Sequence, residues 1–348
     1  MTPMRVAVYY SNRDVRVEER PVPKIGPGEI LVRMRASGIC GSDVMEWYRI
    51  RKAPLVLGHE MTGDVVEVGA GVTGCRTGQR VFVAHHVPCN TCRRCLTGHH
   101  TACETLHTTN FDPGGFAEFI RVPALNVDRG VFILPDGMTY EDGVFIEPLA
   151  CVMRAQRAAN LRPAQSVLVL GSGLSGILHI LLARATGAGR VLATDLHPDR
   201  RKAAVRFGAD GALDPRENVP DRVREMNGGR GVDLAVVCTG APAAFAEAMK
   251  CVDRGGRVLW FATTEPGVEV PVPVCDLWRN DVTLLPSYGS SPFDNAAALE
   301  LIRAGRIPVR DMISHRLPLS QAAEGFRLVA DGGTTLKVIL RPDADPSS

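Results

Sequence analysis

Residues 166–176 read Ser-Val-Leu-Val-Leu-Gly-Ser-Gly-Leu-Ser-Gly, and their pattern indicates the fold of the chain. Its first five residues are typical of a buried strand, and an apolar segment with the length of a helix follows the last glycine. The first glycine permits a tight turn, the second lets a pyrophosphate approach the backbone, and the third lets helix and strand pack closely. Free N–H groups at the helix start favour an anion. Although a glycine pattern alone often marks only a turn, this context predicts a dinucleotide site formed by Gly171, Gly173, Leu174, Ser175 and Gly176.

The acidic residue that follows the next predicted strand bears on the choice of cofactor. Asp195 lies nineteen residues after Gly176. A carboxylate there accepts hydrogen bonds from the ribose hydroxyls and repels a 2′-phosphate, which favours NAD over NADP. Arg200 and Arg201 keep NADP open, because an arginine can also hold a 2′-phosphate. The alternative is that Asp195 only caps the following helix.

After these residues, apolar strands continue to alternate with helix-length segments. Such alternation predicts a doubly wound parallel sheet. The expected strands are 166–170, 190–194, 234–238 and 256–261, and the expected helices are 177–188, 200–208 and 243–250.

Residues 4 to about 145 have a different pattern, made of many short β-rich segments bounded by Gly or Pro. They predict a largely antiparallel, barrel-like domain. Residues 309–340 return to short strands with one helix at 320–330, and we expect them to rejoin that domain. The expected strands of the first part are 6–9, 29–34, 63–68, 79–83 and 116–122.

Length and composition indicate an ordinary protein of two domains. The chain has 348 residues, of which 45% are hydrophobic and 22% charged, with a net charge of +2. This balance gives no electrostatic reason to expect nucleic acid or an anionic membrane as a partner. No apolar run is long enough for a transmembrane helix, and the first ten residues do not resemble a secretory signal. We expect a cytoplasmic location, where thiols stay reduced.

Four cysteines lie within fifteen residues, at Cys89, Cys92, Cys95 and Cys103. Four thiolates can close a tetrahedron around one Zn²⁺, and such a site is structural because no coordination position stays open. Disulfides are disfavoured in a reducing compartment, and four cysteines exceed a two-cysteine redox motif. An iron–sulfur cluster has the same ligand count and stays an alternative.

A more dispersed set could hold a second metal ion. It comprises Cys40, His59, Glu60 and Glu147. A catalytic zinc needs about three protein ligands of N, S or O type and one open position, which a cysteine, a histidine and a carboxylate supply. Taken singly, each residue has a plainer interpretation, such as a buried cysteine or a structural histidine.

The motifs together resemble the zinc-containing medium-chain alcohol dehydrogenases, and most closely their sorbitol and polyol dehydrogenase branch. The resemblance rests on Gly38-Ile39-Cys40-Gly41-Ser42-Asp43, Gly58-His59-Glu60, the four cysteines, Ile146-Glu147-Pro148-Leu149 and Gly171–Gly176, in that order. It implies a GroES-like β-barrel catalytic domain at 1–148 and 290–348, with a zinc lobe at about 86–106. It also implies a Rossmann domain at 149–289 that binds NAD, with the active site between the domains.

The same resemblance implies roles for single residues. Cys40 and His59 would bind the catalytic zinc, with Glu60 as third ligand and Glu147 exchanging through water, or the reverse. Ser42 would pass on the substrate proton, and Tyr288 would line the substrate pocket. The resemblance further implies adenosine-ribose contacts by Asp195 and Arg200, two zinc ions per chain and a dimer or tetramer.

Two positions depart from the family pattern. Met45 stands where a histidine commonly relays the proton to solvent, so the relay must use Ser42, the cofactor ribose and water, or His85 or His86. Ser287, before Tyr288, replaces an arginine of sorbitol dehydrogenases. The loss of that guanidinium disfavours sorbitol itself, so that a smaller, less polar or cyclic hydroxyl compound is an equal alternative.

We therefore expect a zinc-dependent enzyme that transfers a hydride from a small secondary alcohol, polyol-like or cyclic, to NAD and gives a ketone. A threonine-type or other 2,3-diol or amino-alcohol dehydrogenase is the nearest alternative. A zinc-free reductase of the same superfamily would lack both metal groups. A non-catalytic NAD(H)-binding protein is the remaining alternative, to which Met45 and Ser287 lend some support.

Overall fold

The computed structural model describes residues 3–343, and the chain forms two compact units. Unit 1 runs to Ala150 and resumes at Ser290, while unit 2 is Cys151–Gly289. No helix within residues 3–343 has the length and apolar character needed to cross a membrane.

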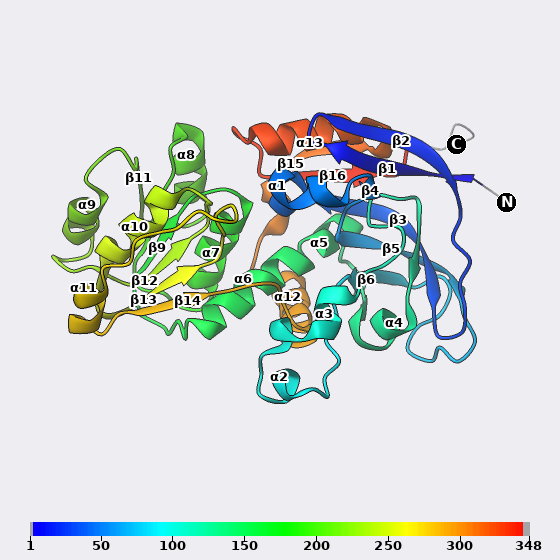
Figure 1. The fold of residues 1–348 in the computed structure, drawn as a ribbon, viewed down its shortest axis with the longest axis horizontal. Helices are drawn as coiled ribbons and strands as arrows, with labels where there is room; N and C mark the ends of the chain where they lie inside the picture. Colours follow the sequence, from blue (N-terminus) through cyan, green and yellow to red (C-terminus); the bar gives the residue numbers. More distant parts are fainter. Residues whose placement is uncertain (1–2, 344–348) are drawn as a thin grey trace. The chain divides into compact units, whose positions relative to one another are not determined.

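Unit 2 is built on one six-stranded sheet in which all neighbouring strands are parallel (Figure 1). This confirms the predicted parallel sheet. Its strands, in spatial order, are β11 (Gly211–Leu213), β10 (Val191–Thr194), β9 (Val167–Leu170), β12 (Val232–Val237), β13 (Val252–Trp260) and β14 (Thr283–Pro286). The helices are α7 (Leu174–Ala185), α8 (Pro198–Arg206), α9 (Val219–Met226), α10 (Pro242–Cys251) and α11 (Val274–Arg279), preceded by α6 (Ile146–Ala158), which begins in unit 1.

The order of these strands reverses beside β9. From β9 the chain builds outward to β11, and it then crosses to the other side of β9 to form β12, β13 and β14. In open parallel sheets, ligands bind at the carboxyl ends of the strands where the order reverses. All four residues of β9 are buried, as expected for a strand covered on both faces. The glycine-rich turn follows β9 directly, so the fold places it at this point of reversal.

Unit 1 contains a larger, mostly antiparallel sheet and a small three-stranded one (Figure 1). The small sheet is β2 (Asp14–Pro21), β1 (Pro3–Ser11) and β4 (Leu55–Val56). The larger sheet runs β15 (Ile313–Pro318), β16 (Lys337–Arg341), β3 (Ile30–Ile39), β5 (Glu60–Val68), β6 (Arg80–Ala84) and β8 (Val131–Ile133), with β7 (Phe119–Val122) also paired to β3. The α-helices are α1 (Glu46–Arg49), α2 (Arg93–Leu96), α3 (Glu104–Thr108), α4 (Ala124–Gly130), α5 (Tyr140–Val144), α12 (Pro292–Arg303) and α13 (Ala322–Asp331).

The last part of the chain returns to unit 1 and packs into its sheet and core. β16 pairs antiparallel with β3, and α13 packs Phe326 against Tyr9 and Phe116 in the same core. The last strand therefore completes the sheet that the first hundred residues begin, as expected from the return to short strands after residue 309.

Gly176→Ala tests the geometry of the glycine-rich turn. An added Cβ would lie 2.0 Å from the carbonyl oxygen of Gly171, and relief requires the backbone of the turn or of α7 to move. We expect the unfolding free energy to fall by about 1–3 kcal/mol in urea denaturation. Ser175→Ala, one residue earlier on the same helix, is the control and should change it by less than about 0.5 kcal/mol. Equal stability of Gly176→Ala and the wild type would contradict this account.

Candidate active site

The pairing of β3 with β5 positions the first candidate site. Gly38 lies opposite Glu60 in this antiparallel pair, so Cys40, just past β3, and His59, just before β5, reach the same end of the sheet. One ligand atom each of Cys40, His59 and Glu60 lies within 4.8 Å of the others. These are one sulfur, one nitrogen and one oxygen donor, the mixture that a catalytic zinc uses. Glu147 is not a member of this group; it lies buried in the first turn of α6.

A buried lysine anchors one side of Glu60. Lys337 Nζ donates to Glu60 Oε2 at 2.5 Å and to the carbonyl oxygen of Ile39 at 3.4 Å, and both charged side chains are 0% exposed. Lys337 comes from β16, in which Val338 pairs with Ile39, so the register of this second pairing delivers the ammonium to the site. Sequence analysis did not single out Lys337. Its one local signal is a charge inside the apolar run Leu336–Leu340.

The second oxygen of Glu60, Oε1, differs from the first in its contacts. Oε1 is buried without a hydrogen-bond partner among the described residues. Leaving such an acceptor unsatisfied costs about 1–3 kcal/mol or more. A cation coordinated by Oε1 would remove this cost. Gly38 makes room for the carboxylate, since a Cβ there would stand 2.1 Å from Oε2.

Asp43 orients the imidazole of His59. Its Oδ1 lies 3.3 Å from Nδ1 of His59, while Oδ2 accepts the backbone N–H of Cys40 at 3.0 Å. A carboxylate on one ring nitrogen fixes the ring and leaves the other nitrogen to bind a metal. Burial disfavours the charged ring, but Asp43 and Cys40 outweigh it and raise the pKa of His59 well above its ordinary value. The negative potential behind that shift favours a cation. Asp43 belongs to the motif Gly38–Asp43, but its place in that motif does not predict this role.

Ser42 lies beside these groups and is held by an arginine that sequence analysis missed. Arg49 Nε donates to the carbonyl oxygen of Ser42 at 2.9 Å, and Nη2 donates to Ser42 Oγ at 3.2 Å. Ser42 N–H in turn donates to Cys40 Sγ at 3.4 Å. The hydroxyl predicted to handle the substrate proton is therefore fixed to the segment that carries the candidate sulfur ligand.

Two further histidines extend from His59. The ring centroids of His59 and His85 are 4.8 Å apart, and those of His85 and His86 are 3.9 Å apart. Burial and the neighbouring His86 lower the pKa of His85 well below its ordinary value, and burial lowers the pKa of His86 to about 4. Both rings are therefore neutral at pH 7. His86 Nδ1 is engaged with the carbonyl oxygen of Thr109 at 2.8 Å.

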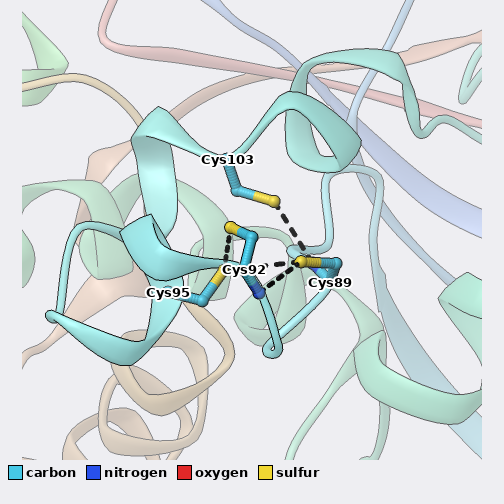
Figure 2. A group of neighbouring side chains, drawn as sticks. All are labelled: Cys89, Cys92, Cys95 and Cys103. Carbon is cyan, nitrogen blue, oxygen red and sulfur yellow. Dashed lines mark hydrogen bonds between the residues drawn. The ribbon is translucent and has the colours of Figure 1, made fainter.

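The four cysteines converge as a separate group in unit 1 (Figure 2). The Sγ atoms of Cys92 and Cys95 are 3.6 Å apart, and those of Cys89 and Cys95 are 3.9 Å apart. The Thr91 N–H, followed by other donors, lowers the pKa of Cys89 to about 5, whereas burial raises that of Cys95 to about 12. A cation between the sulfurs would stabilise all four thiolates, and four sulfur donors suit Zn²⁺.

The glycine-rich turn in unit 2 has the conformation that its glycines permit. Gly171 has φ +97, and Gly173 is the N-cap of α7, so that Leu174 and Ser175 begin the helix. The helix thus starts three residues earlier than predicted. Around the missing Cβ of Gly173, the nearest atom within 4 Å is Arg200 Nη1 at 3.9 Å. This space at a helix N-terminus suits the approach of a pyrophosphate.

Asp195 and Arg200 lie next to the same turn. Asp195 Oδ2 accepts the N–H of Ser172 at 2.9 Å, and Oδ1 accepts the N–H of His197 at 2.8 Å. The Arg200 guanidinium lies 4.0 Å from Oδ2. Arg201 instead donates to the carbonyl oxygen of Asp195 at 2.7 Å and pairs with Asp214 at 3.1 Å. Asp195 therefore ties the second strand to the turn and remains beside Arg200.

The candidate substrate residue Tyr288 is 50% exposed in unit 2. Its neighbour Ser287 accepts a hydrogen bond from Arg154 Nη1 at 2.8 Å. A guanidinium therefore still lies at this position, although it comes from α6 and not from residue 287. Sequence analysis could not find this, because the contact spans 133 residues.

Two family models match the chain, one in each part of its sequence. Residues 26–135 match the alcohol dehydrogenase GroES-like domain, and residues 176–304 match the zinc-binding dehydrogenase family. The second model supports zinc. A similar solved structure supports a nicotinamide cofactor, because it was determined with bound NADP; it is a Sinorhizobium meliloti 1021 protein described as a zinc-binding dehydrogenase. It is 27% identical with a TM-score of 0.87, and the match covers 98% of this chain and 100% of that one.

Named relatives match over nearly their whole length. Sorbitol dehydrogenase of Gallus gallus is 33% identical over 341 residues, which cover 95% of this chain and 94% of the relative. The structure of 2R,3R-butanediol dehydrogenase from Bacillus subtilis is 28% identical with a TM-score of 0.86, and covers 98% of this chain and 100% of its own. The chain thus belongs to the zinc-containing medium-chain alcohol dehydrogenases, close to the sorbitol dehydrogenase branch.

Proposed function

We propose that this protein oxidises a secondary alcohol to a ketone and passes the hydride to NAD, with one catalytic and one structural zinc per chain. The observation that carries the proposal is the group of Cys40, His59 and Glu60, in which a buried carboxylate oxygen has no donor among residues 3–343. A zinc ion with an open position polarises an alcohol oxygen and lowers its pKa, and NAD accepts the hydride.

The residues around the group have separate tasks. Asp43 would orient His59, and Lys337 would hold Glu60 Oε2 so that Oε1 is presented to the metal. This arrangement supports Glu60 as the third ligand, with Glu147 in reserve. Ser42 would accept the alcohol proton through its hydroxyl oxygen. His85 and His86 stay neutral at pH 7, so either can accept a proton only transiently.

We infer that the substrate is a small alcohol with a second polar group near the reacting hydroxyl. Sorbitol and 2,3-butanediol, named in the relatives, both carry hydroxyls on adjacent carbons. The contact of Arg154 with Ser287 supports recognition of a second oxygen by a guanidinium, which offers several donors. A threonine-type amino alcohol is the alternative, because an amine replaces one hydroxyl of the pair.

A panel of vicinal diols, cyclic alcohols, sorbitol and threonine, followed at the NADH absorbance band, tests the activity. We expect turnover with the wild type and a loss of at least about a hundredfold in Cys40→Ser and in His59→Ala, because each removes a metal ligand. NADH binding, measured by fluorescence, is the control and should be unchanged. Near-normal turnover in both variants would contradict the assignment.

Cys95→Ala tests the structural zinc. Metal analysis should find one zinc lost from two, and the unfolding free energy should fall by about 3 kcal/mol or more, because zinc binding contributes directly to folding. Cys75→Ala is the matched control, since Cys75 is also a buried cysteine of unit 1 but lies outside both groups. A chain that keeps two zinc ions, or loses one without losing stability, would disagree with a structural lobe.

Asp195→Asn tests the preference for NAD. Asparagine keeps only one acceptor oxygen, so it can accept from Ser172 or from His197 but not from both, and it lacks the charge that repels a 2′-phosphate. We expect the ratio of kcat/KM for NAD to that for NADP to fall about tenfold or more, which corresponds to about 1.4 kcal/mol. Arg200→Gln should lower use of NADP more than use of NAD. An unchanged ratio in Asp195→Asn would argue against charge-based selection.

A further inference from the structure

One guanidinium holds both polar atoms of Ser42. Arg49 Nε donates to the carbonyl oxygen of Ser42 and Nη2 donates to its Oγ, at 2.9 and 3.2 Å. Arg49 is the last residue of α1, and its N–H donates to the carbonyl oxygen of Met45 at 3.1 Å. Arg49 therefore lies one helical turn after Met45. Its side chain is only 15% exposed, so solvent screens it weakly.

This contact restricts what the hydroxyl of Ser42 can do. A serine hydroxyl has one proton to donate and two lone pairs to accept with, and a guanidinium can only donate. Arg49 fills one lone pair, and the hydroxyl proton must point away from Arg49. One lone pair of Oγ can therefore still accept a proton, and the hydroxyl proton can still leave. A group that passes on a proton needs both.

The same nitrogen also faces the residue that orients His59. Arg49 Nη2 lies 3.6 Å from Asp43 Oδ1, which is 3.3 Å from Nδ1 of His59. Arg49 could thus act on Ser42, or on the candidate metal ligand through Asp43. The shorter distance and the paired hydrogen bonds favour Ser42.

We propose that Arg49 is a positioning residue that directs proton transfer through Ser42, in the absence of a relay histidine at position 45. This inference rests on the proposed function. As the alcohol is oxidised, its O–H bond breaks and its proton bonds to Ser42 Oγ, while the original Ser42 proton leaves for a water molecule. The hydride is taken by NAD. The original proton moves away ahead of the arriving one, so Oγ carries partial negative charge in between, and the fixed positive charge of Arg49 stabilises it while Arg49 itself takes up no proton.

The test compares Arg49→Met, Arg49→Lys, Ser42→Ala and the double variant Ser42→Ala/Arg49→Met. Arg49→Met should lower kcat about tenfold or more with KM for NAD unchanged, and raise the solvent isotope effect on kcat, because proton transfer becomes slower. The kcat of Arg49→Lys should lie between those of the wild type and Arg49→Met, because one ammonium cannot donate to both oxygens of Ser42 with the geometry of the planar guanidinium. In the Ser42→Ala background, Arg49→Met should lower kcat by less than about twofold, because the hydroxyl that Arg49 positions is absent.

Arg51→Met is the matched control, because Arg51 is an exposed arginine of the neighbouring turn and should leave kcat unchanged. Zinc content and the visible spectrum of the cobalt-substituted protein give readouts apart from turnover, and both should match the wild type in Arg49→Met. Independent, multiplying losses from the two substitutions, or an altered cobalt spectrum, would overturn the role through Ser42. Wild-type protein that turns over no alcohol would overturn the proposed function, and this inference with it.

Discussion

The pairing of β3 on both of its sides is the constraint on which the candidate metal site depends. β5 and the residue before it supply Glu60 and His59 on one side, and β16 supplies Lys337 on the other, so that these segments meet where β3 ends, just before Cys40. Burying an ammonium and a carboxylate is expensive unless they contact each other closely. The ladder hydrogen bonds supply the fixed register that makes this contact possible.

The two candidate metal sites differ in what they require of the fold. The four cysteines lie on one local loop with short helical turns, and their sulfurs could approach each other with little help from the rest of unit 1. The group of Cys40, His59 and Glu60 exists only where strands are in register. A one-residue slip of β5 would turn Glu60 to the opposite face of the sheet, because successive side chains of a strand alternate.

This difference also explains what could be predicted from sequence. The turn at Gly171–Gly176 and the four cysteines carry their chemistry in short windows, and the parallel sheet followed from its alternating apolar segments. Lys337 and Arg49 could not be assigned from the sequence. Lys337 contacts Glu60 across 277 residues, and Arg49 reaches Ser42 only because a one-turn helix lies between them. Helix α12 was also missed, although Ser291 and Asp294 form a capping box before it. This capping box is a local signal from which the helix could have been predicted.

The separation of Glu60 from Lys337 has a consequence for biosynthesis. The whole of unit 2 lies between them in the chain, so the ribosome makes β5 long before β16. During that interval the nascent sheet contains a carboxylate without its counter-charge, and only the last part of β3, Ser37–Ile39, lacks its partner on one side, because β7 already pairs with Ile30–Arg33. Unit 2 has no such gap, because all six of its strands are synthesised in one continuous stretch. Unit 2 can therefore complete its sheet as soon as it is synthesised, whereas the larger sheet of unit 1 stays incomplete until β16 is made.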